Sequence, residues 1–150
     1  MMRTGFFILA AMLLLAPAAR AGSDITVINS AERPKGLPFS MAIKAAGLIF
    51  LAGHLGRDAK TGALPADVES QTRLALENIS RTLGLAGSSL ERVVRCTVYL
   101  SDMADFNAVN RVYATFFPED RMPARTTVAV TALARQARIE IACTALAGGE

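Results

Sequence analysis

Between positions 39 and 54 apolar residues fall in two short runs, at 39–45 and 48–54, separated by an Ala-Gly pair. This pattern is typical of a β-hairpin with a tight turn. A turn at 58–62 is predicted to close the unit, because this stretch is polar and ends in glycine. Residues 22–37 are polar and contain proline and glycine, so they predict a lead-in that lies over the fold.

From position 68 the apolar spacing changes to three and four, which predicts a helix with one buried face. That face consists of Val68, Thr72, Ala75, Leu76, Ile79 and Leu83. Gly84 and Gly87 are expected to end the helix, since glycine is common just beyond a helix C-terminus. A second helix is predicted over 105–117, where Asp102 can cap the start and a proline stops the end.

Strict alternation over 93–100 predicts a strand with one core-facing side. The core-facing residues are expected to be Val94, Cys96, Val98 and Leu100. Strands at 126–131 and 138–146 complete the order β-β-α-β-α-β-β, which predicts one α/β domain of the α+β kind, with two helices on one face of a mixed sheet. The other face carries a mixed set that suits packing against neighbouring subunits, namely Thr127, Ala129, Glu140, Ala142 and Thr144.

The first 21 residues have the pattern of a cleavable export signal. Arg3 precedes an unbroken apolar run at 6–16, and Ala19-Arg20-Ala21 presents small residues at the cleavage spacing. A membrane anchor is the alternative, but eleven apolar residues fall short of the roughly 20 that a spanning helix needs. We therefore expect a domain at 22–150 that is exported to the periplasm or secreted, with no membrane association after cleavage.

The charge of the chain changes when the signal is removed. The full sequence has 16 Lys and Arg against 13 Asp and Glu, and loss of Arg3 and Arg20 leaves a formal net charge of +1. A nearly neutral domain without tryptophan lacks the basic and aromatic surface that binds nucleic acids. No nucleic-acid partner is expected.

Metal chemistry is not expected either. Cys96 and Cys143 lie in apolar, core-facing stretches whose spacing matches no zinc or redox motif, and His54 is the single histidine. The cysteines are interpreted as two buried free thiols, with a disulfide as the alternative in an oxidising compartment. His54 is interpreted as a surface or interface residue, with titration near neutral pH as the alternative.

Arg125 and Glu140 are the strongest candidates for chemistry. Arg125 follows Pro123-Ala124 at the start of a strand, and its guanidinium suits a carboxylate ligand. Glu140 interrupts an apolar strand on the face opposite its two isoleucine neighbours, where it either pairs with a cation or positions a water and moves a proton. A structural ion pair between the two residues at a subunit interface is the alternative.

Several motifs together resemble the RidA/YjgF family. They are Gly53 after a hydrophobic strand, Ala86-Gly87-Ser88-Ser89-Leu90, the runs at 97–103 and 106–110, and Pro123-Ala124-Arg125. The resemblance covers residues 34–146 and implies a chorismate-mutase-like fold, assembled as a homotrimer with sheets facing inward and small-molecule clefts between subunits. Its best-known members hydrolyse enamines and imines such as 2-aminoacrylate to a keto acid and ammonia, without a cofactor.

The same resemblance implies roles for individual residues. Arg125 looks like the arginine that grips the substrate carboxylate, and Glu140 like the glutamate that positions the attacking water. Asn110 matches an asparagine of the second helix, and Thr127 matches a position where many members place a cysteine whose main chain helps hold the substrate. Gly53 matches the glycine after the hydrophobic strand, beside the substrate.

This sequence departs from the family pattern on the substrate side of the cleft. Phe39 replaces a tyrosine, Ala52 replaces a serine, and His54 replaces a common glutamine. Loss of one hydrogen bond to a charged group costs about 1.5 to 3 kcal/mol, so activity is expected to survive with a preference for a larger or more apolar imino acid. For Phe39 the alternative is packing in the core or at an interface, and for Asn110 a bond to neighbouring backbone.

Three functions follow as hypotheses. The first is an exported trimeric deaminase of 2-aminoacrylate-like imino acids, with Arg125 and Glu140 as its catalytic pair. The second is a trimeric protein that binds a small carboxylate or metabolite without turnover. A ribonuclease is the third, and the near-neutral charge and the lack of a histidine pair argue against it.

Overall fold

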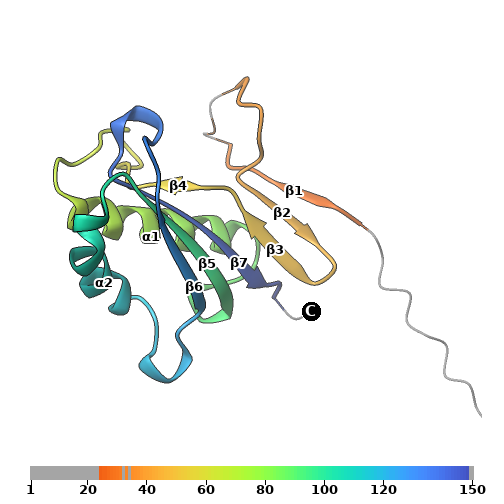
Figure 1. Ribbon diagram of the computed structural model, residues 1–150. Helices are drawn as coiled ribbons and strands as arrows, with labels where there is room; N and C mark the ends of the chain where they lie inside the picture. Colours follow the sequence, from red (N-terminus) through yellow and green to blue (C-terminus); the bar gives the residue numbers. More distant parts are fainter. Residues whose placement is uncertain (1–23, 32, 34, 149–150) are drawn as a thin grey trace, which may run out of the picture.

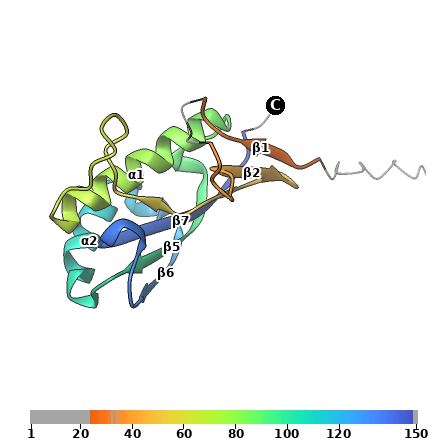
Figure 2. The same ribbon diagram turned by 90° about the horizontal axis from the view of Figure 1, so that it is seen from above.

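A single mixed sheet forms the scaffold of the computed structural model, which describes residues 24–31, 33 and 35–148 (Figure 1). The strands are β1 (Thr26–Ile28), β2 (Ala42–Ala45), β3 (Leu48–Leu51), β4 (His54–Leu55), β5 (Val93–Leu100), β6 (Ala124–Ala129) and β7 (Ile139–Leu146). The sheet has the order β1-β2-β3-β7-β5-β6, with β4 also paired to β7, and only β5 and β6 run parallel. β1 and β6 therefore lie at the two ends of the sheet (Figure 2).

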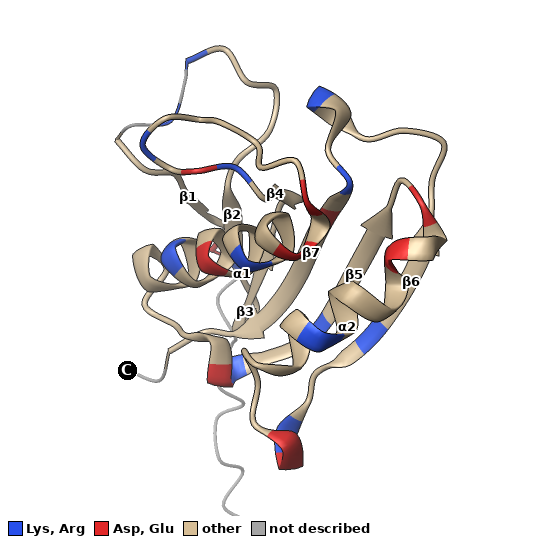
Figure 3. Ribbon diagram, turned by 90° about the vertical axis from the view of Figure 1, so that its left-hand side faces the viewer, with Lys and Arg blue, Asp and Glu red and all other residues tan. Residues whose placement is uncertain are grey.

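Two helices, α1 (Val68–Leu85) and α2 (Phe106–Ala114), lie on the same face of the sheet (Figure 3). We call this the helix face and the opposite one the open face. The predicted fold class and helix placement are confirmed. The predicted export signal lies outside the described residues, and among those that are described no helix is long and apolar enough to cross a membrane.

The predicted hairpin is present as β2 and β3. Ala46 and Gly47 both have positive φ, 49° and 75°, which is the geometry of a type I′ turn and matches the right-handed twist of the strands. The predicted lead-in is partly wrong, because it contains β1, which pairs antiparallel with β2. β1 has three residues, of which only Ile28 is buried, so it carries almost no alternating pattern.

The predicted strand over 48–54 is interrupted after Leu51 by a β-bulge. Phe50 pairs with Thr144 and His54 pairs with Ile141. Four residue steps on one strand therefore match three steps on β7, which leaves one extra residue in the segment 51–53. The bulge keeps Leu51 and His54 on the helix face and turns Gly53 towards the open face.

Local signals explain the ends of α1. The Asp67 side chain accepts a hydrogen bond from the Ser70 N–H at 2.7 Å and caps the first turn. At the other end Gly87, with φ of 72°, is the left-handed C′ residue of a Schellman motif, in which the Ser88 N–H donates to the Leu83 carbonyl at 2.9 Å. Gly84 lies inside the last turn, so only Gly87 has the predicted role. The whole predicted apolar face is buried.

The start of α2 is also as predicted, but its end is not. Asp102 caps a short 3₁₀ turn (Met103–Asp105) by accepting from the Ala104 N–H at 2.9 Å, and the α-helix follows directly. The helix ends at Ala114, three residues before the predicted position. Phe117 is nevertheless buried, because the chain after the helix folds its ring to 4.9 Å from the Tyr113 ring.

Side chains of β5 and β7 that face the helices build the core. They are Cys96, Val98 and Leu100 from β5, and Ile139, Ile141, Cys143 and Ala145 from β7, all buried. The prediction that Val94 also faces the core is wrong. A register shift between Val93 and Arg95 turns it outward, and it is 42% exposed.

Cys96 and Cys143 form a disulfide across β5 and β7. The two residues are direct partners in the strand register, with Cα atoms 4.1 Å apart. The interpretation as free thiols is therefore wrong, because alternation in each strand turns both side chains to the same face at the same level.

Removal of this disulfide is expected to lower the free energy of unfolding by about 4 kcal/mol, because it closes a loop across a sequence separation of 47. Urea unfolding of the Cys96→Ala, Cys143→Ala double variant against the wild type measures the loss. Two free thiols titrating in the unfolded, unreduced wild type would contradict the pairing.

Candidate functional site

Arg125 lies in the edge strand β6 and is held from the helix face by α2. Its Nη2 donates to Asn110 Oδ1 at 2.6 Å, and its Cζ lies 4.6 Å from the centre of the Tyr113 ring. The structure thus brings Arg125 and Asn110 together as predicted. One of five guanidinium N–H groups is used by Asn110, which leaves donors for a bound carboxylate.

Tyr113 was not identified from the sequence as a site residue. It is 4% exposed, and its hydroxyl has no hydrogen-bond partner in the part of the chain that the structure describes. Burial raises the pKa of Tyr113 to about 12, so the ring is neutral and presents a π face to the cation. The available signal was its position three residues after Asn110, on the same side of the helix.

A shallow hollow of about 330 Å³ lies beside Arg125. Its lining residues are Asn110, Tyr113, Ala114, Met122, Pro123 and Arg125. Arg125 is the only charged group among them, and the rest of the wall is largely apolar. The hollow therefore suits one end of a small organic anion that also carries an apolar part.

Glu140 lies in β7 with its side chain on the open face. It is flanked by Tyr99 of β5 and Leu55 of β4 in the register. Its carboxylate lies directly against Gly53, where a Cβ atom would overlap Oε1. Position 53 must therefore be glycine for the carboxylate to lie where it does.

Arg125 and Glu140 occupy opposite faces of the sheet. Arg125 is the register partner of Cys96 on β5, and the Cys96 side chain points into the core. The Arg125 side chain lies on the same face and contacts α2. Glu140 alternates with the buried Ile139 and Ile141 and so points the other way. The two groups therefore form no ion pair within one protomer, and one protomer does not bring both groups to one ligand. The alternative of an ion pair at a subunit interface stays a prediction.

Thr127 has the same orientation as Arg125. It pairs with Val98, whose side chain is buried beneath the helices, so both residues lie on the helix face. The sequence-based assignment of Thr127 and Ala129 to the mixed open face is wrong, because β6 is aligned with β5 in a parallel register that the sequence does not reveal.

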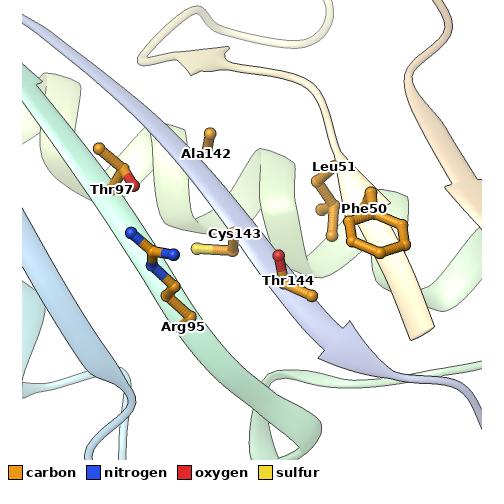
Figure 4. A pocket seen from close by; sticks show the side chains of 7 residues that line it. All are labelled: Phe50, Leu51, Arg95, Thr97, Ala142, Cys143 and Thr144. Carbon is orange, nitrogen blue, oxygen red and sulfur yellow. The ribbon is translucent and has the colours of Figure 1, made fainter.

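The open face is hollowed between β3, β7 and β5 (Figure 4). The lining residues are Phe50, Leu51, Arg95, Thr97, Ala142, Cys143 and Thr144. None of the predicted site residues lines this hollow. Phe50 is 46% exposed and Val128 37%, so the face carries apolar surface that no helix of the protomer covers. Among the described residues, no group of three or more His, Cys, Asp or Glu could hold a metal ion.

Residues 31–147 match the family model described as Endoribonuclease L-PSP. The chain belongs to this family. It is 44% identical over 119 residues to a RutC family protein from Pyrococcus horikoshii, covering 79% of this chain and 93% of that protein. It is 37% identical over 124 residues to the 2-iminobutanoate/2-iminopropanoate deaminase of Mus musculus, covering 81% and 91% of the two chains.

A solved structure of E. coli TdcF with bound serine has the same fold. The TM-score is 0.73 at 30% identity, and the match covers 81% of this chain and 98% of TdcF. The resemblance to RidA and YjgF proteins is confirmed.

The structure shows the surroundings of two residues that depart from the RidA/YjgF pattern. Phe39 is 53% exposed, with the Arg33 guanidinium 5.8 Å from its ring, so it does not pack in the protomer core. Ala52 donates its N–H to the Met41 carbonyl at 3.0 Å and lies within the bulge. Neither side chain supplies the hydroxyl that the family pattern has at its position.

His54, the third departure from the RidA/YjgF pattern, is half-buried in the protomer and bonded at both ring nitrogens. Of the predicted surface or interface placement, the surface part is therefore wrong, and the interface part stays a prediction. Nδ1 lies 2.7 Å from the Ala52 carbonyl, and Nε2 lies 2.8 Å from Thr82 Oγ1. Burial lowers the pKa of His54 from its ordinary value of 6.5, the bond to Ala52 opposes this shift, and the nearby Arg81 charge reinforces it.

The stability of the protein is expected to fall as the pH drops below about 6.5. The unfolded chain takes up a proton on His54 near that pH, whereas the folded ring does so only at lower pH, so protonation favours unfolding. The measurement is urea unfolding at several pH values between about 5 and 7.5. His54→Gln, which does not titrate, should show a smaller decrease, and an equal decrease in both proteins would contradict the assignment.

Proposed function

We propose that this protein is an exported enamine/imine deaminase that hydrolyses 2-imino acids to keto acid and ammonia, in a site shared by two protomers. The observation that carries the proposal is the placement of Arg125 and Glu140. The arginine is oriented by Asn110 and Tyr113, and Asn110 takes one of its five N–H donors. The Glu140 carboxylate lies against Gly53 and, among the residues that the structure describes, pairs with no cation. The deaminase name of the mouse relative supports the reaction class.

A shared site follows from the separation of the two groups by the sheet. Identical protomers in a closed ring contact each other through two different surfaces. One surface then carries Arg125 near the β6 edge, and the other carries Glu140 on the open face. The exposed apolar residues of the open face support such self-association, and the homotrimer implied by the family resemblance would contain three equivalent sites.

The reaction balances with water alone. Arg125 holds the substrate carboxylate, and Glu140 takes a proton from water as its oxygen bonds to the carbon of the protonated imine. Glu140 then passes this proton to the nitrogen of the carbinolamine, and the C–N bond breaks as the hydroxyl oxygen forms the carbonyl of the keto acid. The hydroxyl proton returns to Glu140 and leaves with ammonia as ammonium, which regenerates the carboxylate. Met122 and Ala114 line the hollow beside Arg125, and this apolar wall supports a substrate with an apolar side chain.

Export is part of the proposal. Its support is the signal-like pattern of the first 21 residues together with the disulfide between Cys96 and Cys143. Disulfides form and persist in oxidising compartments and are rare where thiols are kept reduced.

Binding without turnover is the second candidate function. The observation that favours it is the loss of two hydroxyl groups at Phe39 and Ala52 relative to the family pattern. TdcF, a structural relative, was solved with bound serine. Calorimetric titration with keto acids separates the candidates, because tight binding without turnover favours the binding protein.

Activity is expected when the mature protein is added to an amino-acid oxidase that generates imino acids, with keto-acid release as the readout. Arg125→Ala should lower kcat/KM by about a hundredfold, the effect of losing charged hydrogen bonds to the carboxylate. The matched control is Arg111→Ala, which removes an exposed ion pair to Glu69 and should leave activity unchanged. No acceleration over the uncatalysed rate across several imino acids would exclude the deaminase.

Mixed assemblies test the shared site. Arg125→Ala and Glu140→Gln proteins are each expected to have only a small residual activity. Unfolding and refolding them together at equal amounts should restore about a quarter of wild-type activity, since a quarter of the interfaces then join two intact groups. Mixing without refolding is the control. No recovery in refolded, correctly assembled mixtures would show that the two residues do not act across an interface.

A further inference from the structure

We infer that His54 is a positioning residue for Glu140, which it serves by fixing the β-bulge at residues 51–53. The inference rests on the proposed function, because it concerns the carboxylate that we assign to the reaction. In this role His54 acts through Glu140 and does not itself contact the substrate or the attacking water.

The bulge leaves a backbone group that the sheet does not satisfy. Ala52 lies between β3 and β4, outside the ladder with β7, and its carbonyl needs another donor. The His54 ring turns back across one residue and its Nδ1 donates to this carbonyl at 2.7 Å. The histidine therefore closes the extra residue into a small hydrogen-bonded ring.

The other end of the imidazole is anchored in the core. Nε2 accepts from the Thr82 hydroxyl at 2.8 Å, and Thr82 is 1% exposed in the last turn of α1, on its buried face. With Nδ1 protonated for Ala52, the neutral ring satisfies both partners. His54 thus connects an irregular strand edge to a rigid helix.

Gly53 links this clamp to the carboxylate. It lies between Ala52 and His54 in the chain, and its Cα is packed against Glu140 closely enough that a Cβ would overlap the carboxylate. Within the described residues Glu140 makes no side-chain hydrogen bond, so this contact is what locates its carboxylate. A shift of the bulge backbone changes the surface against which Glu140 rests.

Substitutions at position 54 separate positioning from packing. His54→Gln retains one donor and one acceptor at similar reach, whereas His54→Leu retains only bulk. We expect His54→Leu to lower kcat about ten- to a hundredfold with little change in KM, as expected when a catalytic group is misplaced but carboxylate binding is intact. His54→Gln should recover most of the kcat.

Two threonines of α1 supply a matched control for the helix anchor. Thr72 and Thr82 are both fully buried, and each uses its single hydroxyl proton in one hydrogen bond. Thr72 donates to the Val68 carbonyl at 2.7 Å, whereas Thr82 donates to His54 Nε2 at 2.8 Å instead of to the Asn78 carbonyl, which lies 3.1 Å away. Only Thr82 contacts His54. Thr82→Val and Thr72→Val should therefore lose similar stability, but only Thr82→Val should lower kcat.

A spectroscopic readout makes the test independent of turnover. In isotope-labelled protein without substrate, His54→Leu and Thr82→Val should shift the Gly53 amide and Glu140 carboxyl resonances, while His54→Gln and Thr72→Val leave them near their wild-type positions. Unshifted resonances in His54→Leu would overturn the inference, as would a kcat within about twofold of wild type. If the wild type turns over no imino acid, the proposed function fails, and the resonances still decide whether His54 positions Glu140.

Discussion

Alternation of side chains across the sheet places Arg125 and Glu140 on opposite faces, and the rest of the site depends on this separation. Arg125 is level with the buried Cys96, whereas Glu140 lies between two buried isoleucines of β7 and points away from the helices. A rotamer change cannot carry either group through a hydrogen-bonded sheet. The proposed reaction, which uses both residues, therefore requires two copies of the chain, so that in this proposal assembly is a condition of activity.

Each half of the proposed site is prepared within its own protomer. On the helix face, α2 orients the guanidinium through Asn110 and Tyr113, and the start of α2 is tied to β7 by the ion pair of the nearly buried Asp105 with Arg138, at 2.6 Å and 3.0 Å. The strands below are cross-linked by the disulfide in the same row as Arg125. Rigid support of this kind reduces the cost of ordering the arginine when a ligand binds.

On the open face, the corresponding support is the bulge between β3 and β4. Bulges interrupt a ladder and redirect side chains, and they need compensation for the backbone groups that they leave without partners. Here His54 provides that compensation from within the strand, and Asn78 of α1 adds hydrogen bonds to the Leu55 and Arg57 carbonyls at 3.0 Å and 2.9 Å. A distorted edge thus becomes a defined surface for the glutamate.

The sequence by itself determined the helices, the hairpin and the main strands, because hydrophobic period, caps and turn residues are local properties: the buried face of α1 and the positive φ values at Ala46 and Gly47 are examples. Its motifs also led to Arg125, Asn110 and Glu140. Only the tertiary structure decided the bulge before His54, the face of Thr127 and the pairing of Cys96 with Cys143. These depend on the register between strands far apart in the chain, and a shift of one residue reverses every face.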